Sequence, residues 1–155
     1  MPIITVLGDL FDNEFGAEAI AHGCNCQGIM GAGIALEFKK RYPEMHQEYF
    51  RRCRFAKPRE FNVGDAFLWK EDGKPFVFNL GTQENCWNQK ATYEGIEAAL
   101  TEMRRLADEE GIASIALPRI GAGLGGLSWN KVQAVIKRVF KNWAGTLYVY
   151  GEGVL

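Results

Sequence analysis

The chain has 155 residues, of which 47% are hydrophobic and 24% are charged, and its formal net charge is -1 at pH 7. This length and composition predict one globular domain over residues 1–155 with a single buried core. The sequence contains neither an apolar run of about 18 residues nor a secretory signal pattern, so we expect a soluble, cytoplasmic protein without a membrane partner. A charge this close to zero argues against broad electrostatic binding of nucleic acid, so any bound anion must be held locally.

Six short apolar runs have the length of β-strands and alternate with helical patterns. In chain order these runs are residues 3–7, 19–24, 63–69, 76–80, 114–117 and 146–150. The helical patterns lie around Ile34, Ala35 and Phe38, from Pro43 to about residue 55, over residues 93–106 before Gly111, and over residues 132–140 with Ser128 as N-cap. Strands that alternate with helices predict a layered α/β domain.

Four cysteines, Cys24, Cys26, Cys53 and Cys86, are spaced too irregularly for a disulfide framework, and we expect reduced thiols. His22 stands close to two of them, in the stretch His-Gly-Cys-Asn-Cys, which raises the question of a zinc site. Two cysteines one residue apart lack the usual two-residue separation, and no second ligand pair follows at finger spacing. We therefore predict no metal site, and a small buried thiol is a simpler interpretation than a nucleophile.

Two glycine-rich segments each follow a predicted strand and precede a predicted helix. They are Gly31-Ala32-Gly33 and residues 121–126, with the sequence Gly-Ala-Gly-Leu-Gly-Gly. Glycine lets the backbone approach a ligand, and the free N–H groups at the start of a helix carry partial positive charge. The two segments therefore predict a pair of anion-binding loops. Two tight turns that use glycine for their geometry alone are the alternative.

The surrounding sequence excludes two common nucleotide sites. Residues 121–126 satisfy the spacing G-x-G-x-x-G, but no Asp or Glu occurs between Glu110 and Glu152 to hold the ribose hydroxyls of a dinucleotide. Neither segment continues as Gly-Lys-Ser or Gly-Lys-Thr, so a P-loop is also excluded. We expect the ligand to lie across both loops.

Four characteristic segments occur in order along the chain. They are Val6-Leu7-Gly8-Asp9-Leu10, Ala21-His22-x-x-Asn25-x-x-Gly28-x-Met30-Gly31-x-Gly33-Ile34-Ala35, Asn79-Leu80-x-Thr82-Gln83, and Leu117-Pro118-Arg119-Ile120-Gly121-x-Gly123-Leu124. Together they resemble the macrodomain family nearly end to end, and most closely its branch of ADP-ribose 1″-phosphate phosphatases and terminal ADP-ribose glycohydrolases. The resemblance implies a three-layer α/β/α sandwich around a mixed, mostly parallel sheet of about six strands. It also implies that the domain binds ADP-ribose and needs no cofactor.

The resemblance assigns parts of the ligand to parts of the chain. Asp9 accepts a hydrogen bond from the adenine amino group, residues 28–34 and 121–125 enclose the diphosphate, and Tyr150 lines the adenine pocket. A helix or turn cap for Asp9 and a place in the core for Tyr150 are the alternatives. The implied ligand-binding residues are Asp9, Leu10, Gly28, Met30, Gly31, Ala32, Gly33, Ile34, Thr82, Gln83, Arg119, Ile120, Gly121, Ala122, Gly123, Leu124, Gly125 and Tyr150.

Asn25 and His22 are the implied catalytic residues. Asn25 matches an asparagine that faces the distal ribose in the family, and its amide both donates and accepts hydrogen bonds. His22 lies three residues earlier, at the end of a buried strand, where a near-neutral pKa would let it act as general base or acid. A structural histidine is the alternative.

The chain departs from the glycohydrolase branch at two positions. That branch uses a lysine after the Leu-x-Thr segment to form a covalent adduct with the opened ribose, and an aspartate after the Gly-x-Gly-Leu loop. This chain has Gln83 and Gly125 there. A glutamine forms no Schiff base and a glycine moves no proton, so we do not expect the lysine-dependent mechanism.

Three classes of function follow. We favour a monomeric hydrolase that removes a phosphate, acyl or protein substituent from the 1″ position of ADP-ribose by attack of a positioned water. A non-catalytic module that reads ADP-ribose on protein or nucleic acid, or sequesters it, is the first alternative. A binder of RNA or poly(ADP-ribose) is the second, but a solvated helix face is the better explanation of the basic residues in the acid-free interval 111–151. We also expect residues 84–89, with Trp87, to lie near the mouth of the pocket.

Overall fold

The computed structural model of the protein describes residues 3–88, 90–123 and 125–151. Within these ranges, six strands form one sheet with the order β1-β6-β5-β2-β4-β3. The strands are β1 (Ile3–Val6), β2 (Ala19–Asn25), β3 (Ala66–Trp69), β4 (Phe76–Gln83), β5 (Ser114–Pro118) and β6 (Thr146–Tyr150). All neighbouring pairs are parallel except β3 and β4, which pair antiparallel at one edge. The predicted mixed, mostly parallel sheet is confirmed.

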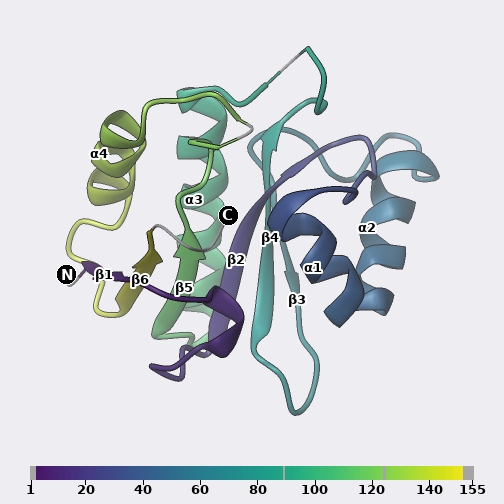
Figure 1. Ribbon diagram of the computed structural model, residues 1–155. Coiled ribbons are helices and arrows are strands. Elements are labelled where there is room, and N and C mark those ends of the chain that lie inside the picture. Colours follow the sequence, from purple (N-terminus) through teal and green to yellow (C-terminus); the bar gives the residue numbers. More distant parts are fainter. Residues whose placement is uncertain (1–2, 89, 124, 152–155) are drawn as a thin grey trace.

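Helices cover both faces of the sheet and give the protein three layers (Figure 1). α1 (Gly33–Arg41) and α2 (Pro43–Arg54) lie on one side, and α3 (Tyr93–Glu110) and α4 (Trp129–Val139) lie on the other. The short 3-10 helix η1 (Leu10–Asp12) contributes to the core on the α1 side. Each face has its own buried apolar cluster, so the predicted α/β/α sandwich is also confirmed, whereas the expected single core is divided in two by the sheet.

Local signals set most boundaries of these elements. The Thr92 side chain accepts a hydrogen bond from the Gly95 amide and begins α3, and Gly111 ends the same helix with a φ of 71°. Ser128 occupies the predicted N-cap of α4, but its side chain makes no capping hydrogen bond. Among the residues described, no helix is both long enough and apolar enough to cross a bilayer.

One strand begins later than its apolar pattern predicts. β3 starts at Ala66 rather than at residue 63, because residues 62–65 form a turn. The Asp65 carboxylate accepts a hydrogen bond from the Asn62 amide at 2.8 Å, and the Asp65 amide donates back to the Asn62 carbonyl at 3.0 Å. An aspartate that bonds its own local backbone favours a turn over a strand.

The sheet opens between β2 and β5. These strands pair only at Ala19 with Ile115 and at Ile20 with Ala116, although β2 continues as far as Asn25. Beyond this point the chain leaves β2 for α1 on one face, and it leaves β5 for α4 on the other face. Ligands of open α/β sheets bind at such a switch point, at the carboxyl ends of the strands. The two glycine-rich segments flank this switch point, and we call the opening between the ends of β2 and β5 the crevice.

Candidate functional site

The loop after β2, residues 26–32, forms one wall of the crevice and ends at α1. Gly31, Ala32 and Gly33 are exposed, and their amides donate to no acceptor among the residues described. Ala32 is the N-cap of α1 and provides no side-chain cap, and the first turn of α1 has no acidic residue. Gly33 has a φ of 60°, which only glycine adopts at low cost. This helix start therefore presents free N–H donors and partial positive charge.

The loop after β5, residues 119–127, forms the opposite wall. Its backbone is folded back on itself by hydrogen bonds from the Leu127 amide to the Gly121 carbonyl at 2.8 Å and from the Gly126 amide to the Gly123 carbonyl at 3.1 Å. A Cβ atom at Gly125 would lie 2.7 Å from the Gly121 oxygen, so this position admits no side chain. Leu124 belongs to the implied ligand-binding set but lies outside the described residues.

The remaining residues of the implied set divide by burial. Those that are exposed or half-buried at the carboxyl edge are Asp9, Gly31, Ala32, Gly33, Ile34, Gln83, Arg119, Gly121, Ala122 and Gly123. Those that are buried are Leu10, Gly28, Met30, Thr82, Ile120, Gly125 and Tyr150. The first group is available to a ligand in this structure, whereas the second supports the loops from below.

Asn25 is bonded to its own loop. Its Nδ2 donates to the Ile29 carbonyl at 2.7 Å, its Oδ1 accepts from the Gln27 amide at 2.9 Å, and its backbone carbonyl accepts from the Tyr49 hydroxyl at 2.8 Å. The residue is 8% exposed. The side chain predicted to face the distal ribose therefore shapes the β2 loop, and its second amide hydrogen donates to no acceptor in the part of the chain described.

The near-neutral pKa expected for His22 is wrong. The ring is completely buried, stacks on Phe38 with centroids 3.8 Å apart, and places Nε2 2.7 Å from the Asn79 Oδ1. Burial lowers the pKa of His22 to about 4, and the hydrogen bond to Asn79 offsets only part of this effect. A neutral ring without access to solvent exchanges no proton with a substrate, so the structure favours the alternative, a structural histidine.

Asp9 and Tyr150 also have the features of their alternative roles, a helix cap and a core residue. The Asp9 carboxylate caps η1 by accepting a hydrogen bond from the Phe11 amide at 2.9 Å, but the residue is exposed and its second oxygen remains open to a ligand. Tyr150 is 2% exposed and belongs to the core, so its ring is not open to a ligand in this structure.

Arg119 is the cation of the implied set. It is half-buried directly after β5, and it forms no ion pair within the described ranges. Its guanidinium carbon lies 5.5 Å from the centre of the Trp129 ring. Because no carboxylate of residues 3–88, 90–123 and 125–151 pairs with it, Arg119 adds positive charge to the crevice.

Three of the four thiols are buried, and their surroundings keep them protonated and unreactive. Cys24, Cys26 and Cys53 are buried. Burial raises the pKa of Cys26 to about 12 and that of Cys53 to about 11, and it raises the pKa of Cys24 well above its ordinary value. Among the described residues, no three His, Cys, Asp or Glu side chains are grouped so that they could hold a metal ion.

The β2 loop is held by four residues that no sequence pattern indicated. Tyr49 and Arg54 come from α2, Arg59 follows α2, and Glu84 follows β4. Arg59 forms an ion pair with Glu84 at 2.8 Å, and the Glu84 carbonyl accepts a hydrogen bond from the Cys26 amide at 3.1 Å. Burial raises the pKa of Tyr49, which keeps its hydroxyl a hydrogen-bond donor. No spacing in the sequence relates these residues to Asn25.

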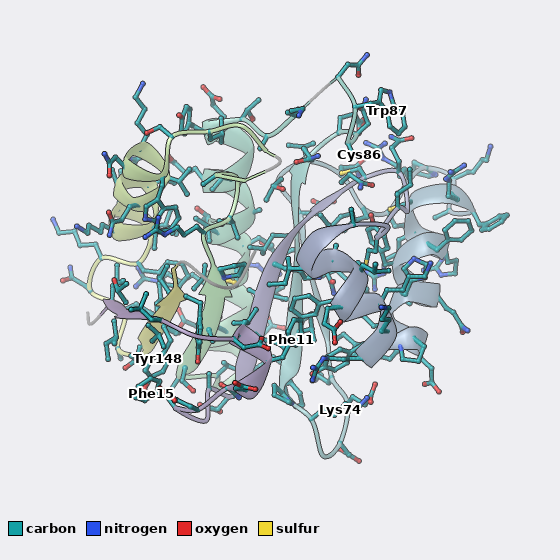
Figure 2. All side chains as sticks on the ribbon, viewed as in Figure 1. Phe11, Phe15, Lys74, Cys86, Trp87 and Tyr148 are labelled. Carbon is teal, nitrogen blue, oxygen red and sulfur yellow. The ribbon has the colours of Figure 1, made fainter. Side chains whose placement is uncertain are left out.

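The loop after β4 carries an exposed tryptophan. Figure 2 shows Trp87 and Cys86 on this loop, and Trp87 is 59% exposed. The Asn85 side chain accepts hydrogen bonds from the amides of Trp87 at 3.1 Å and Asn88 at 2.9 Å, so the exposed ring stands on an ordered turn. The Glu84 carbonyl connects this turn to the β2 loop, in agreement with a position near the crevice.

A separate groove of about 630 Å³ lies beside β3, between α2 and α3. It contains no residue of the implied set. Salt bridges already engage its acidic side chains Glu60, with Arg51, and Glu102, with Arg105. The free amides of Gly31, Ala32 and Gly33 lie at the crevice, which is therefore the candidate ligand site.

Comparisons with known proteins identify the family and the fold of the chain. The family described as Macro domain matches residues 21–136. The DNA ADP-ribosyl glycohydrolase of Mycobacterium tuberculosis is 36% identical over 137 residues, which is 86% of this chain and 37% of that protein. The ADP-ribose 1″-phosphate phosphatase of Meyerozyma guilliermondii is 27% identical over an alignment of 159 positions, gaps included, that covers 86% of this chain and 91% of that protein.

A solved structure gives the same result for the fold. The macrodomain of M. tuberculosis DarG superposes with a TM-score of 0.84 and 34% identity, and the alignment covers 96% of each chain. The chain spans little more than a third of the mycobacterial glycohydrolase, and the part that it spans includes both loops of the crevice. The chain belongs to the macrodomain family.

Proposed function

We propose that the crevice binds ADP-ribose, with the diphosphate between the two glycine-rich loops. The observation that carries this proposal is the run of free, exposed amides at Gly31, Ala32 and Gly33 at the uncapped start of α1. Two negative charges suit such a site, because backbone N–H groups and a helix start stabilise anions without a lysine. Arg119 supplies further positive charge, and the exposed carboxylate of Asp9 is available to the adenine amino group.

We further propose that the domain hydrolyses ADP-ribose derivatives substituted at the 1″ carbon. The two relatives named above are a DNA ADP-ribosyl glycohydrolase and an ADP-ribose 1″-phosphate phosphatase, which supports hydrolysis in general. The oxygen of a water molecule bonds to C1″ as the bond from C1″ to the substituent breaks, the substituent leaves with the bonding electrons, and a phosphate oxygen of the substrate accepts a proton of the water. Gln83, Gly125, the buried thiols and the buried His22 provide no nucleophile, so catalysis would rest on positioning and on the loop amides.

A non-catalytic ADP-ribose module remains the second candidate. The observation that favours it is the engagement of the Asn25 amide by its own loop, together with the burial of His22. Such a module would bind ADP-ribose with the same loops and release no product.

Turnover measured side by side on four substrates separates these candidates. The substrates are ADP-ribose 1″-phosphate, O-acetyl-ADP-ribose, ADP-ribosylated DNA and ADP-ribosylated protein, and calorimetry with ADP-ribose runs in parallel. Saturable binding with release of the substituent from at least one substrate supports the hydrolase. Saturable binding without any release supports the reader, and no binding at high micromolar ADP-ribose contradicts both.

Asn25→Ala should weaken ADP-ribose binding by roughly tenfold, because the loss of a buried hydrogen-bonding partner destabilises the binding conformation of the β2 loop by about 1–3 kcal/mol. Asn13→Ala is a matched control. Asn13 bonds the carbonyl and amide of Ala17, four residues on, at 3.0 Å each, just as Asn25 bonds those of Ile29. The Asn13 loop leads to the opposite edge of the sheet, so this variant should bind normally. Equal affinities of the two variants would contradict the role given to Asn25.

A further inference from the structure

Three successive carbonyl groups, of the last residue of β2 and the first two residues of the β2 loop, each accept a hydrogen bond from a different side chain. The Tyr49 hydroxyl donates to the Asn25 carbonyl at 2.8 Å, Arg59 Nη1 donates to the Cys26 carbonyl at 3.5 Å, and Arg54 Nε donates to the Gln27 carbonyl at 2.7 Å. A fourth carbonyl, that of Ile29, accepts from the Asn25 amide at 2.7 Å. Three of these four donors come from α2 or the segment just after it.

Electrostatics explain why an anion-binding loop needs its carbonyl groups held in this way. Each peptide group has a donor end and an acceptor end, and a carbonyl oxygen that faces a diphosphate repels it. A loop that binds an anion through N–H groups must keep its carbonyls turned away. Donors that capture the carbonyls of residues 25–27 from the α2 side fix that orientation before the ligand arrives, which lowers the cost of ordering the loop on binding.

The contacts of the loop with α2 are close. A Cβ atom at Gly28 would lie 3.0 Å from Phe50 and 3.3 Å from the Arg54 side chain, so the loop rests directly on this helix. Tyr49 is completely buried and therefore does not touch a ligand in the crevice. Its effect on binding must pass through Asn25 and the loop.

We propose that Tyr49 and Arg54 are positioning residues that hold the carbonyls of the β2 loop away from the diphosphate of the ligand. The inference rests on the proposed binding of ADP-ribose. It assigns to the α2 helix a role in recognising the diphosphate, although α2 contributes no group that contacts it.

Tyr49→Phe removes one hydroxyl and tests the proposal against a matched control. In Tyr42→Phe, another buried tyrosine loses a hydrogen bond of 2.8 Å to a backbone carbonyl, that of Pro75. Both variants should lose similar thermal stability. We expect Tyr49→Phe to raise the Kd for ADP-ribose by about tenfold and to leave the Kd for adenosine, which has no phosphate, unchanged. Tyr42→Phe should change neither constant.

Arg54→Lys separates orientation of the carbonyl from attraction by charge. The lysine keeps the positive charge but lacks the Nε donor, so the proposal predicts weaker ADP-ribose binding. Arg52→Lys is the control on the same helix, where the arginine pairs with Glu48 and lies over the Phe67 ring. Normal binding by Arg54→Lys, or an equal loss in Tyr49→Phe and Tyr42→Phe, would overturn the positioning role. A wild-type protein that fails to bind ADP-ribose would instead overturn the proposed function.

Discussion

Gly125→Ala should lower the affinity for ADP-ribose by roughly ten- to hundredfold, the largest loss that we expect from a single methyl group. The added carbon would lie 2.7 Å from the oxygen, 2.9 Å from the Cα and 3.0 Å from the carbonyl carbon of Gly121. All three atoms belong to the backbone, so no side chain can move aside and the β5 loop itself must open. Forcing extra volume into a packed site costs about 1–3 kcal/mol, which corresponds to that range of affinity.

Gly111→Ala controls for a general loss of stability. Gly111 ends α3 with a φ of 71°, and a Cβ atom there would meet no atom within 4 Å. The substitution strains the helix end by about 1 kcal/mol but lies far from the carboxyl edge of the sheet. Calorimetric titration of both variants with ADP-ribose should show a loss in Gly125→Ala alone. Normal binding by Gly125→Ala would show that the β5 loop does not form a wall of the site.

Lowering the pH from 7 to 5 should reduce the free energy of unfolding by about 2 kcal/mol through His22 alone. The folded protein keeps His22 neutral down to a pKa of about 4, whereas the unfolded chain binds a proton near pH 6.5. The unfolded state therefore holds more protons between these values, and acidification favours unfolding. The stabilisation is complete above pH 6.5 and is lost as the pH falls toward 4.

Urea unfolding at several pH values measures this slope. His22→Gln should flatten the dependence of the unfolding free energy on pH between pH 7 and 5. His46→Gln should retain most of this dependence. Burial and Lys39 also lower the pKa of His46, but that ring is only partly buried. The His22 ring signals in an NMR titration should stay those of a neutral ring down to pH 5. Titration of His22 near pH 6.5 would contradict its burial and would restore it as a candidate general base.

The sequence predicted those features of the fold that depend on local patterns. The strand at residues 146–150 has the predicted bounds, and the helix that starts at Pro43 ends within one residue of its expected end. The start of β3 was missed because an apolar pattern does not reveal the Asn62–Asp65 hydrogen bonds. Glycine positions indicated both loops, because a positive φ and close backbone approach restrict the choice of residue at those points.

The parts that sequence reasoning missed depend on contacts between distant segments. Asn25 and Tyr49 are 24 residues apart, and no periodicity connects them. His22 lies in the middle of β2 and not at the strand end expected from the sequence, and its burial under Phe38 follows from how α1 packs on β2. For the same reason, the exposed amides could be located from the sequence, whereas the donors that orient their loop could not.

Backbone amide NMR during titration with ADP-ribose tests the central claim most directly. If the two loops hold the diphosphate through their N–H groups, the signals of Gly31, Ala32 and Gly33 and those of Gly121 and Gly123 should shift in proportion to bound ligand. The amides of the Asn13 loop should not move. Saturable binding that leaves both sets of loop amides unchanged would contradict the account.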